Sequence, residues 1–323
     1  MEYLNPLSIL NISPEKLGKL TSKHIKNARK RLLAEFELNE VTVLKVKGGR
    51  EFDRTSLLKL LNELEQEELR TFHMMVYKNQ GLCQFLEAGS FGFFTTEAVT
   101  NFPQTPAYTL RFVEFIAPYF SYQYNKVLHS TFRKGDWENL LVLCTHPLVL
   151  PDKWHSQCYA DTLKHLVGKY KDLESYTERI EQGMPIDKDL YGFYEEVWLE
   201  LVNTLPEYFM DVRDRYALKL RDLAIAVNNV KSRPAIARMI LYAGLKLDIS
   251  QASKDKLQYI LDQLPASSQS NNTGGSSKKS KAGGSGTGGY QYAGQEEGME
   301  SWQMALIGGA VLTGIWLIVR TIF

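Results

Sequence analysis

Two cysteines and two histidines lie close together near the middle of this sequence. They are Cys144, His146, His155 and Cys158. Thiolate and imidazole groups at short spacings are the ligands of tetrahedral zinc sites. Cys144, however, falls on the apolar side of an expected helix, and Pro147 and Pro151 restrict the loop that would have to close the site. We therefore expect no metal site and no bound cofactor.

The same residues are the strongest candidates for catalysis. A cysteine hydrolase needs a thiol beside a histidine that is oriented by a carboxylate, and sequence separation does not test this arrangement. The sequence contains no nucleophile elbow, phosphate-binding loop, dinucleotide fingerprint or His-Glu-x-x-His motif. We expect a protein that is not an enzyme. An enzyme with an unrecognised site stays open, and substitution of Cys144 or His155 would test it.

Composition limits the partners and the compartment. The 38 basic and 37 acidic residues nearly cancel, so no overall basic field draws the chain to nucleic acid. Cys83, Cys144 and Cys158 are odd in number and widely spaced, which is not the pattern of a disulfide framework. A reducing compartment, the cytoplasm, fits this cysteine usage.

An amphipathic helix is predicted from Ser22 onward. Its apolar side chains recur at helical spacing in Ile25, Ala28, Leu32 and Phe36. Its solvent-facing side carries the basic residues Lys23, Lys26, Lys30 and Arg31. We predict that this basic face binds a cytosolic protein partner.

Two stretches near the N-terminus resemble a J-domain, the module of DnaJ-type co-chaperones. Residues 5–12 read N-P-L-S-I-L-N-I, similar to the family's opening D/N-P-Y-x-V-L-G-V. Residues 25–32 read I-K-N-A-R-K-R-L, similar to its second helix, I-K-K-A-Y-R-K-L. The family's His-Pro-Asp signature, which stimulates ATP hydrolysis by Hsp70, is replaced by Glu37, Leu38 and Asn39. The resemblance thus implies a J-like shape without co-chaperone activity.

A short β-hairpin and another helix are expected next. Val41–Val46 is rich in β-formers, Gly48 and Gly49 suit a turn, and Arg50–Phe52 would return as a second strand. Thr55 is the expected N-cap of the following helix. Its buried stripe comprises Leu57, Leu60, Leu61 and Leu64.

Successive amphipathic helices are predicted for residues 101–264, packed as an antiparallel bundle or an irregular solenoid. Pro118 is expected to interrupt the aromatic-rich segment Leu110–Leu128. The predicted inward-facing side chains of the later helices include Leu140, Leu141, Val197, Leu201, Leu223, Val227, Val230, Met239 and Ile240.

The C-terminal part differs in composition. Residues 265–301 are rich in Ser, Gly, Asn and Lys and are expected to form a flexible linker. Residues 302–323 form an apolar segment that, as a helix, would extend roughly 30 Å across a bilayer. Trp302 and Arg320 suit its two interfaces, and Ala310 and Gly314 form a small-xxx-small pair for helix packing.

The expected organisation is mainly α-helical: a J-like segment (1–100), a helical bundle (101–264), a linker (265–301) and a transmembrane tail anchor (302–323). The leading hypothesis is a tail-anchored, single-pass membrane protein whose cytoplasmic body binds or scaffolds a protein partner. An alternative is a membrane-perturbing effector that assembles through its tail helix, with self-association at Ala310 and Gly314.

Overall fold

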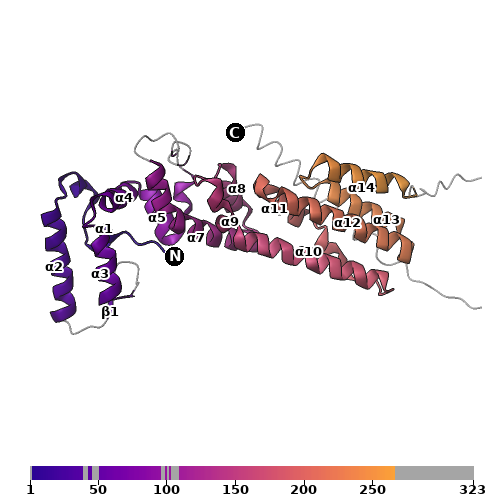
Figure 1. The fold of residues 1–323 in the computed structure, drawn as a ribbon. Coiled ribbons are helices and arrows are strands. Elements are labelled where there is room, and N and C mark those ends of the chain that lie inside the picture. The colour runs from indigo at the N-terminus through magenta and orange to yellow at the C-terminus, as the bar shows by residue number, and fades with distance from the viewer. Residues whose placement is uncertain are drawn as a thin grey trace, which may run out of the picture. The chain divides into compact units, whose positions relative to one another are not determined.

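The computed structural model describes residues 2–38, 43–45, 51–95, 99, 102 and 109–265. The chain divides into two units, Met1–Ser268 and Gln269–Phe323, and all described residues belong to the first. This first unit is mainly helical, as the sequence predicts (Figure 1). No helix among these residues combines the length and apolar character needed to cross a membrane.

The first part of the unit consists of short helices and one hairpin. Its elements are α1 (Pro6–Ile9), η1 (Pro14–Lys19), α2 (Ser22–Leu38), β1 (Val43–Lys45), β2 (Glu51–Asp53), α3 (Arg54–Glu63), α4 (Glu67–Lys78), α5 (Gln80–Ala88) and η2 (Phe91–Phe93). The predicted hairpin is present, because β1 pairs antiparallel with β2 and Leu44 lies opposite Phe52.

The predicted N-cap of α3 is wrong by two residues. The helix begins at Arg54, and the Asp53 carboxylate accepts a hydrogen bond of 2.8 Å from the backbone N–H of Ser56. The hydrogen bonds from Ser56 lower the pKa of Asp53, because they stabilise its charged form. Asp and Thr are both good N-caps, and the end of β2 places Asp53 in that position.

A small hydrophobic core joins α1, α2 and α3. It includes side chains from all three helices that are almost fully removed from solvent, namely Leu7, Ile9, Ile25, Leu32, Leu57, Leu61 and Leu64. The apolar stripe predicted for α3 is therefore confirmed. Helices with one apolar face need such a partner surface, since packing supplies most of their stability in a protein.

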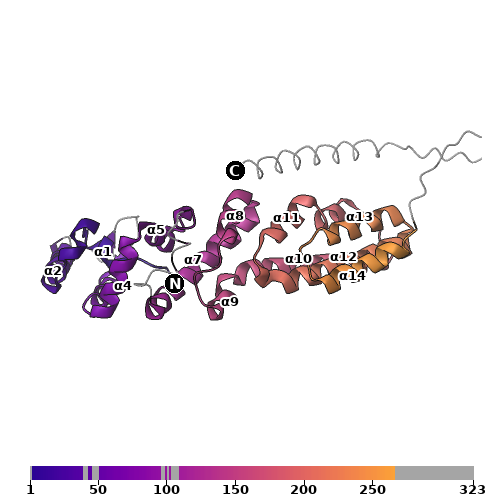
Figure 2. The same cartoon turned by 90° about the horizontal axis from the view of Figure 1, so that it is seen from above.

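The second part of the unit contains longer helices. They are α7 (Leu110–Lys134), α8 (Trp137–Thr145), η4 (Asp152–Trp154), α9 (His155–Cys158), α10 (Ala160–Glu181), η5 (Lys188–Phe193), α11 (Glu196–Thr204), η6 (Glu207–Phe209), α12 (Met210–Lys231), α13 (Pro234–Leu245) and α14 (Gln251–Gln263). Helix α12 packs against α10, α13 and α14, and these helices run side by side in both views (Figures 1 and 2).

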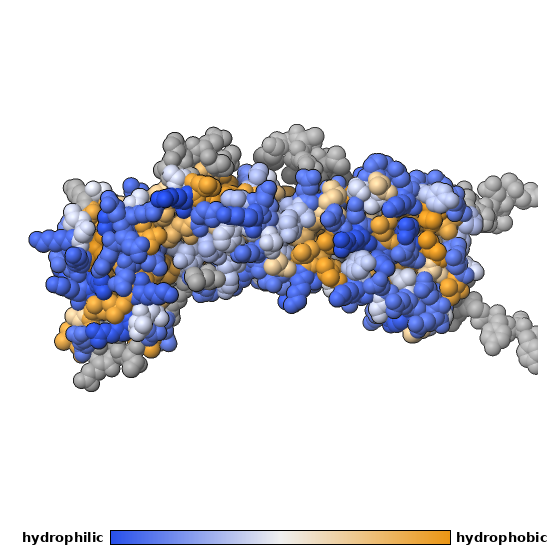
Figure 3. Space-filling view, in the orientation of Figure 1, coloured by the Kyte–Doolittle hydropathy of each residue, from blue (hydrophilic) through white to orange (hydrophobic). Residues whose placement is uncertain are grey.

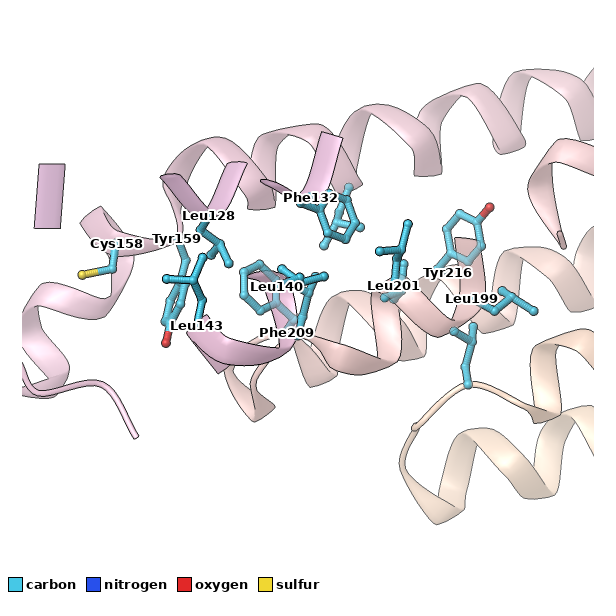
Figure 4. Packing of buried hydrophobic residues seen from close by; sticks show 14 of the residues in the cluster. Leu128, Phe132, Leu140, Leu143, Cys158, Tyr159, Leu199, Leu201, Phe209 and Tyr216 are labelled. Atoms are coloured by element: carbon cyan, nitrogen blue, oxygen red, sulfur yellow. The ribbon is translucent and has the colours of Figure 1, made fainter. Parts of the chain in front are cut away.

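A large hydrophobic core runs through this second part and continues into α4 and α5. Figure 4 shows where α7, α8, α11, η6 and α12 meet, with Leu140 and Phe209 at the centre. Both of these side chains are fully buried. The close-up also shows Phe132 and Leu201 in the same layer, so side chains far apart in sequence fix the order of the helices.

Helix α7 continues through Pro118, contrary to the predicted interruption. Proline inside a helix removes one hydrogen bond and costs about 3 kcal/mol. Here the proline itself is exposed, whereas Ile116, Ala117 and Phe120 are fully buried. Burial of one large apolar side chain contributes roughly 1.5–3 kcal/mol, so the flanking residues offset the cost of the proline.

Four side chains predicted to face the core are exposed instead. They are Leu141, Val197, Val230 and Met239, which are 46%, 59%, 42% and 40% exposed. Each lies next to or near a residue that is buried, for example Leu140 and Ile240. The predicted stripes were too wide, because these helices bury only a narrow face against their neighbours.

Candidate partner-binding surface

Helix α2 has one buried face and one strongly basic face. Ile25 and Leu32 are 2% and 9% exposed and pack into the small core. The predicted basic face, defined as Lys23, Lys26, Lys30 and Arg31, is fully on the exposed side of the helix. The small core thus fixes the orientation of α2, and this orientation presents the basic face to solvent.

The basic face is not neutralised by the rest of the described chain. None of its four side chains forms a salt bridge or hydrogen bond with another described residue. From Ser22 to Ala34, α2 contains no Asp or Glu. Two other charged residues of α2 are paired outside this face: Arg29 binds Glu65, and Glu37 accepts a hydrogen bond of 3.0 Å from Arg54. Glu35, the first acidic residue of α2, follows Arg31 by one turn.

This charge distribution does not serve the stability of α2. Cations near the N-terminal end of a helix are opposed by the helix macrodipole, and like charges one turn apart repel each other. Lys23 lies in the first turn of α2, and Lys23, Lys26 and Lys30 follow one another at one-turn spacing. These lysines therefore gain no stabilisation from the helix macrodipole or from one another.

Figure 3 shows that the surface is mixed. Hydrophilic side chains cover most of the visible face, with smaller hydrophobic patches between them.

A buried polar network holds α1 against α4 and α5, and α1 shares the small core with α2. The Tyr3 hydroxyl lies 3.0 Å from Nδ1 of His73, and Nε2 of His73 lies 2.9 Å from a Glu63 carboxylate oxygen. Asn5 Nδ2 donates to the Tyr3 hydroxyl and to the His73 carbonyl, and its backbone N–H donates to Glu87. These contacts connect residues as much as 82 positions apart in sequence.

The protonation of the network follows from its burial. Burial raises the pKa of Tyr3 well above its usual value, so the hydroxyl in contact with Nδ1 of His73 keeps its proton. A carboxylate accepts hydrogen bonds, so Nε2 of His73 is the donor in its contact with Glu63. The order Tyr, His, Glu resembles a catalytic relay, but both Tyr3 and His73 are only 1% exposed. Through these contacts the two buried groups hold the N-terminal segment against α4.

The J-domain resemblance places its missing signature at the end of α2. Glu37 and Leu38 lie in the last turn of this helix, and Asn39 lies outside the described residues. The Glu37 carboxylate is engaged by Arg54. Leu38 is 83% exposed.

The sulfur and imidazole groups singled out at the start do not assemble into a site. Within the described ranges, no cluster of three or more His, Cys, Asp or Glu side chains is arranged to hold a metal ion. His155 Nε2 lies 3.3 Å from the Leu150 carbonyl. Burial raises the pKa of Cys144 and of Cys158 to about 12, so both remain thiols at neutral pH. A thiolate nucleophile or ligand would need the opposite shift.

The predicted membrane residues lie outside the described part of the chain. This applies to the interface residues Trp302 and Arg320 and to the packing pair Ala310 and Gly314. Membrane insertion and self-association through this segment therefore stay predictions.

Two groupings in the structure had no counterpart in the sequence analysis. One is the network of Tyr3, Asn5, Glu63 and His73, and the other is a polar pocket containing His129 and His165. The histidines of these groupings lie in no recognisable sequence motif, so the sequence alone did not indicate them.

No protein-family model, curated protein or solved structure matches this chain.

Proposed function

We propose that this chain is a membrane-tethered interaction protein whose helical body binds an acidic segment of a protein partner through the basic face of α2. Lys23, Lys26, Lys30 and Arg31 support this role, because they are exposed and none forms a salt bridge with an acidic side chain among the described residues. Charge complementarity determines partner choice and association rate at such surfaces.

The proposal includes the J-like character of residues 1–100 and the stacked helices of residues 101–264 as its binding body. It also assigns no Hsp70-stimulating activity to the chain, since Glu37, Leu38 and Asn39 replace the signature tripeptide. The helical body supplies a rigid support, because the small core and the Tyr3–His73 contact fix α1, α2 and α4.

We also propose that residues 265–323 tether the helical body to a membrane. Residues 265–301 act as a flexible linker, and residues 302–323 anchor the body in a bilayer with most of the chain in the cytoplasm. A tether raises the effective concentration of the body near membrane-associated partners without any additional contact.

Charge reversal on the basic face tests the binding role. The triple variant Lys23→Glu, Lys26→Glu and Lys30→Glu in the full chain is expected to lower recovery of the captured partner at least about tenfold. Recovery is measured by affinity capture from detergent-solubilised membranes, followed by quantitative mass spectrometry. The captured proteins are expected to contain acidic segments, and raised salt is expected to release them.

A matched control separates this surface from a general effect of charge. Lys171→Glu, Lys188→Glu and Lys256→Glu change the net charge by the same amount at exposed positions elsewhere. This control is expected to retain the partner. If the α2 variant keeps every partner that the unchanged chain captures, the basic face is not the binding surface.

A further inference from the structure

A polar pocket lies between α7 and α10, away from the basic face of α2. Its volume is about 460 Å³, and it is lined by His129, Arg133, Asp161, Lys164, His165, Gly168, Lys169 and Asp172. A volume of this size is within the usual range for small-molecule sites. The packing of α10 against α7 brings its two sides together.

The pocket has an excess of positive charge. Arg133, Lys164 and Lys169 contribute three positive charges, and Asp161 and Asp172 contribute two negative ones, so neutral imidazoles leave a net charge of +1. Asp161 is already engaged by Asn125, whose Nδ2 donates to its carboxylate at 2.7 Å. The backbone N–H of Asp161 in turn donates to the Asn125 side-chain oxygen at 2.9 Å.

Two histidines add titratable donors to these cations. The rings of His129 and His165 lie 6.0 Å apart between centroids. Phe132 and Trp198 pack edge-on against His165, and Lys169 lies over the Trp198 ring with Nζ 5.8 Å from its centroid. The aromatic rings thus hold an imidazole and an ammonium group at the same pocket.

The charges around His165 oppose its protonation in the free protein. Burial lowers the pKa of His165, and the nearby His129, Lys169 and Arg133 lower it further, while Asp172 acts in the opposite direction. Lys164 and the engaged carboxylate of Asp161 complete the charged lining. An anion in the pocket would reduce the repulsion among these groups and stabilise the imidazolium form.

We propose that this pocket binds the phosphate group of a small phosphorylated molecule. A doubly charged phosphate can accept charge-assisted hydrogen bonds from guanidinium, ammonium and imidazole groups together. A divalent cation fits less well, because Arg133, Lys164 and Lys169 repel it. This inference does not depend on the partner-binding role of α2.

Binding is tested by NMR on the full chain in detergent, with its six histidines labelled with ¹³C. Inorganic phosphate is the first probe, and sodium chloride at matched ionic strength is the reference. Phosphate is expected to shift the His129 and His165 signals in a saturable way, leave those of His24, His73, His146 and His155 in place, and raise the measured pKa of His165. Shifts that chloride reproduces would overturn the proposal.

Substitutions inside and outside the pocket lining test whether phosphate binds there. Arg133→Gln and Lys164→Gln are each expected to raise the Kd for phosphate at least about fivefold, because each removes a charge-assisted contact. Lys171→Gln, an exposed position on α10 outside the pocket lining, is expected to leave the Kd unchanged. Equal weakening by all three substitutions would contradict a defined pocket.

Two further probes distinguish the sources of the phosphate group. Glucose 6-phosphate represents a soluble phosphomonoester, and vesicles containing phosphatidic acid represent a lipid headgroup. Saturable binding of glucose 6-phosphate that is lost in Arg133→Gln supports the small-molecule site. Binding to vesicles alone would overturn that assignment.

Discussion

Replacing His73 by alanine is expected to lower the free energy of unfolding by about 3 kcal/mol, because buried polar networks are costly to leave incomplete. The substitution removes the contacts of 3.0 Å to Tyr3 and 2.9 Å to Glu63. It also removes an imidazole that packs edge-on against Phe115 with ring centroids 5.0 Å apart. Urea unfolding followed by circular dichroism measures the change.

Two variants show whether the network causes this loss. Tyr3→Phe keeps the aromatic ring and removes one hydroxyl, so it is expected to cost about 1–2 kcal/mol. His146→Ala removes a partly exposed imidazole and is expected to change stability by less than about 0.5 kcal/mol. If His73→Ala is no more destabilising than His146→Ala, the network does not hold α1 against α4 and α5.

Replacing Arg213 by alanine is expected to destabilise the protein by about 3–5 kcal/mol, because it empties a large buried site in the core. This side chain is only 2% exposed, and its guanidinium donates a hydrogen bond of 2.9 Å to the Leu205 carbonyl. Its second contact, with the largely exposed Asp248, measures 3.6 Å. Urea unfolding again gives the change in free energy.

A second substitution at Arg213 separates the loss of side-chain volume from the loss of charge. Burial lowers the pKa of Arg213, which shows that its charge is held at a cost. Arg213→Met keeps most of the side-chain volume and removes the charge, so it is expected to cost less than half as much as Arg213→Ala. Arg215→Ala alters an exposed arginine on the same helix and is expected to have little effect. A methionine variant as unstable as the alanine variant would assign the effect to the hydrogen bond instead.

The helices were predictable where apolar residues recur at regular spacing. Tyr216, Leu220, Leu223 and Val227 lie on one stripe of α12, and all four are buried. Periodicity is a local signal, and it gives the buried direction of a helix before any neighbour is known. The hairpin was predictable for the same reason, from β-forming residues on both sides of a glycine pair.

Features that depend on long-range packing were not predictable. The continuation of α7 through Pro118 depends on the burial of its flanking residues, which outweighs a local preference. The exposure of Leu141 and Val197 depends on how closely neighbouring helices approach. Local propensity is a weak guide where tertiary contacts decide the outcome.

One candidate site was predictable from the sequence, and the other depends on long-range packing. Helical spacing predicted the basic face of α2, and its four cations are exposed in the structure. The pairing of Glu65 with Arg29 rather than with a cation of this face could be seen only in the fold. The phosphate pocket also needed the fold, because His129 and His165 lie on different helices and meet only when α7 and α10 pack.

Site-specific photo-crosslinking shows directly whether a partner binds at α2. A photoreactive residue in place of Asn27 lies on the exposed side of α2 beside Lys23, Lys26 and Lys30, and the same residue in place of Lys256 on α14 is the control. We expect a crosslinked adduct to an acidic protein segment from position 27 alone, abolished by charge reversal of those lysines. Identical adducts from both positions, or an adduct at 27 that survives charge reversal, would contradict it.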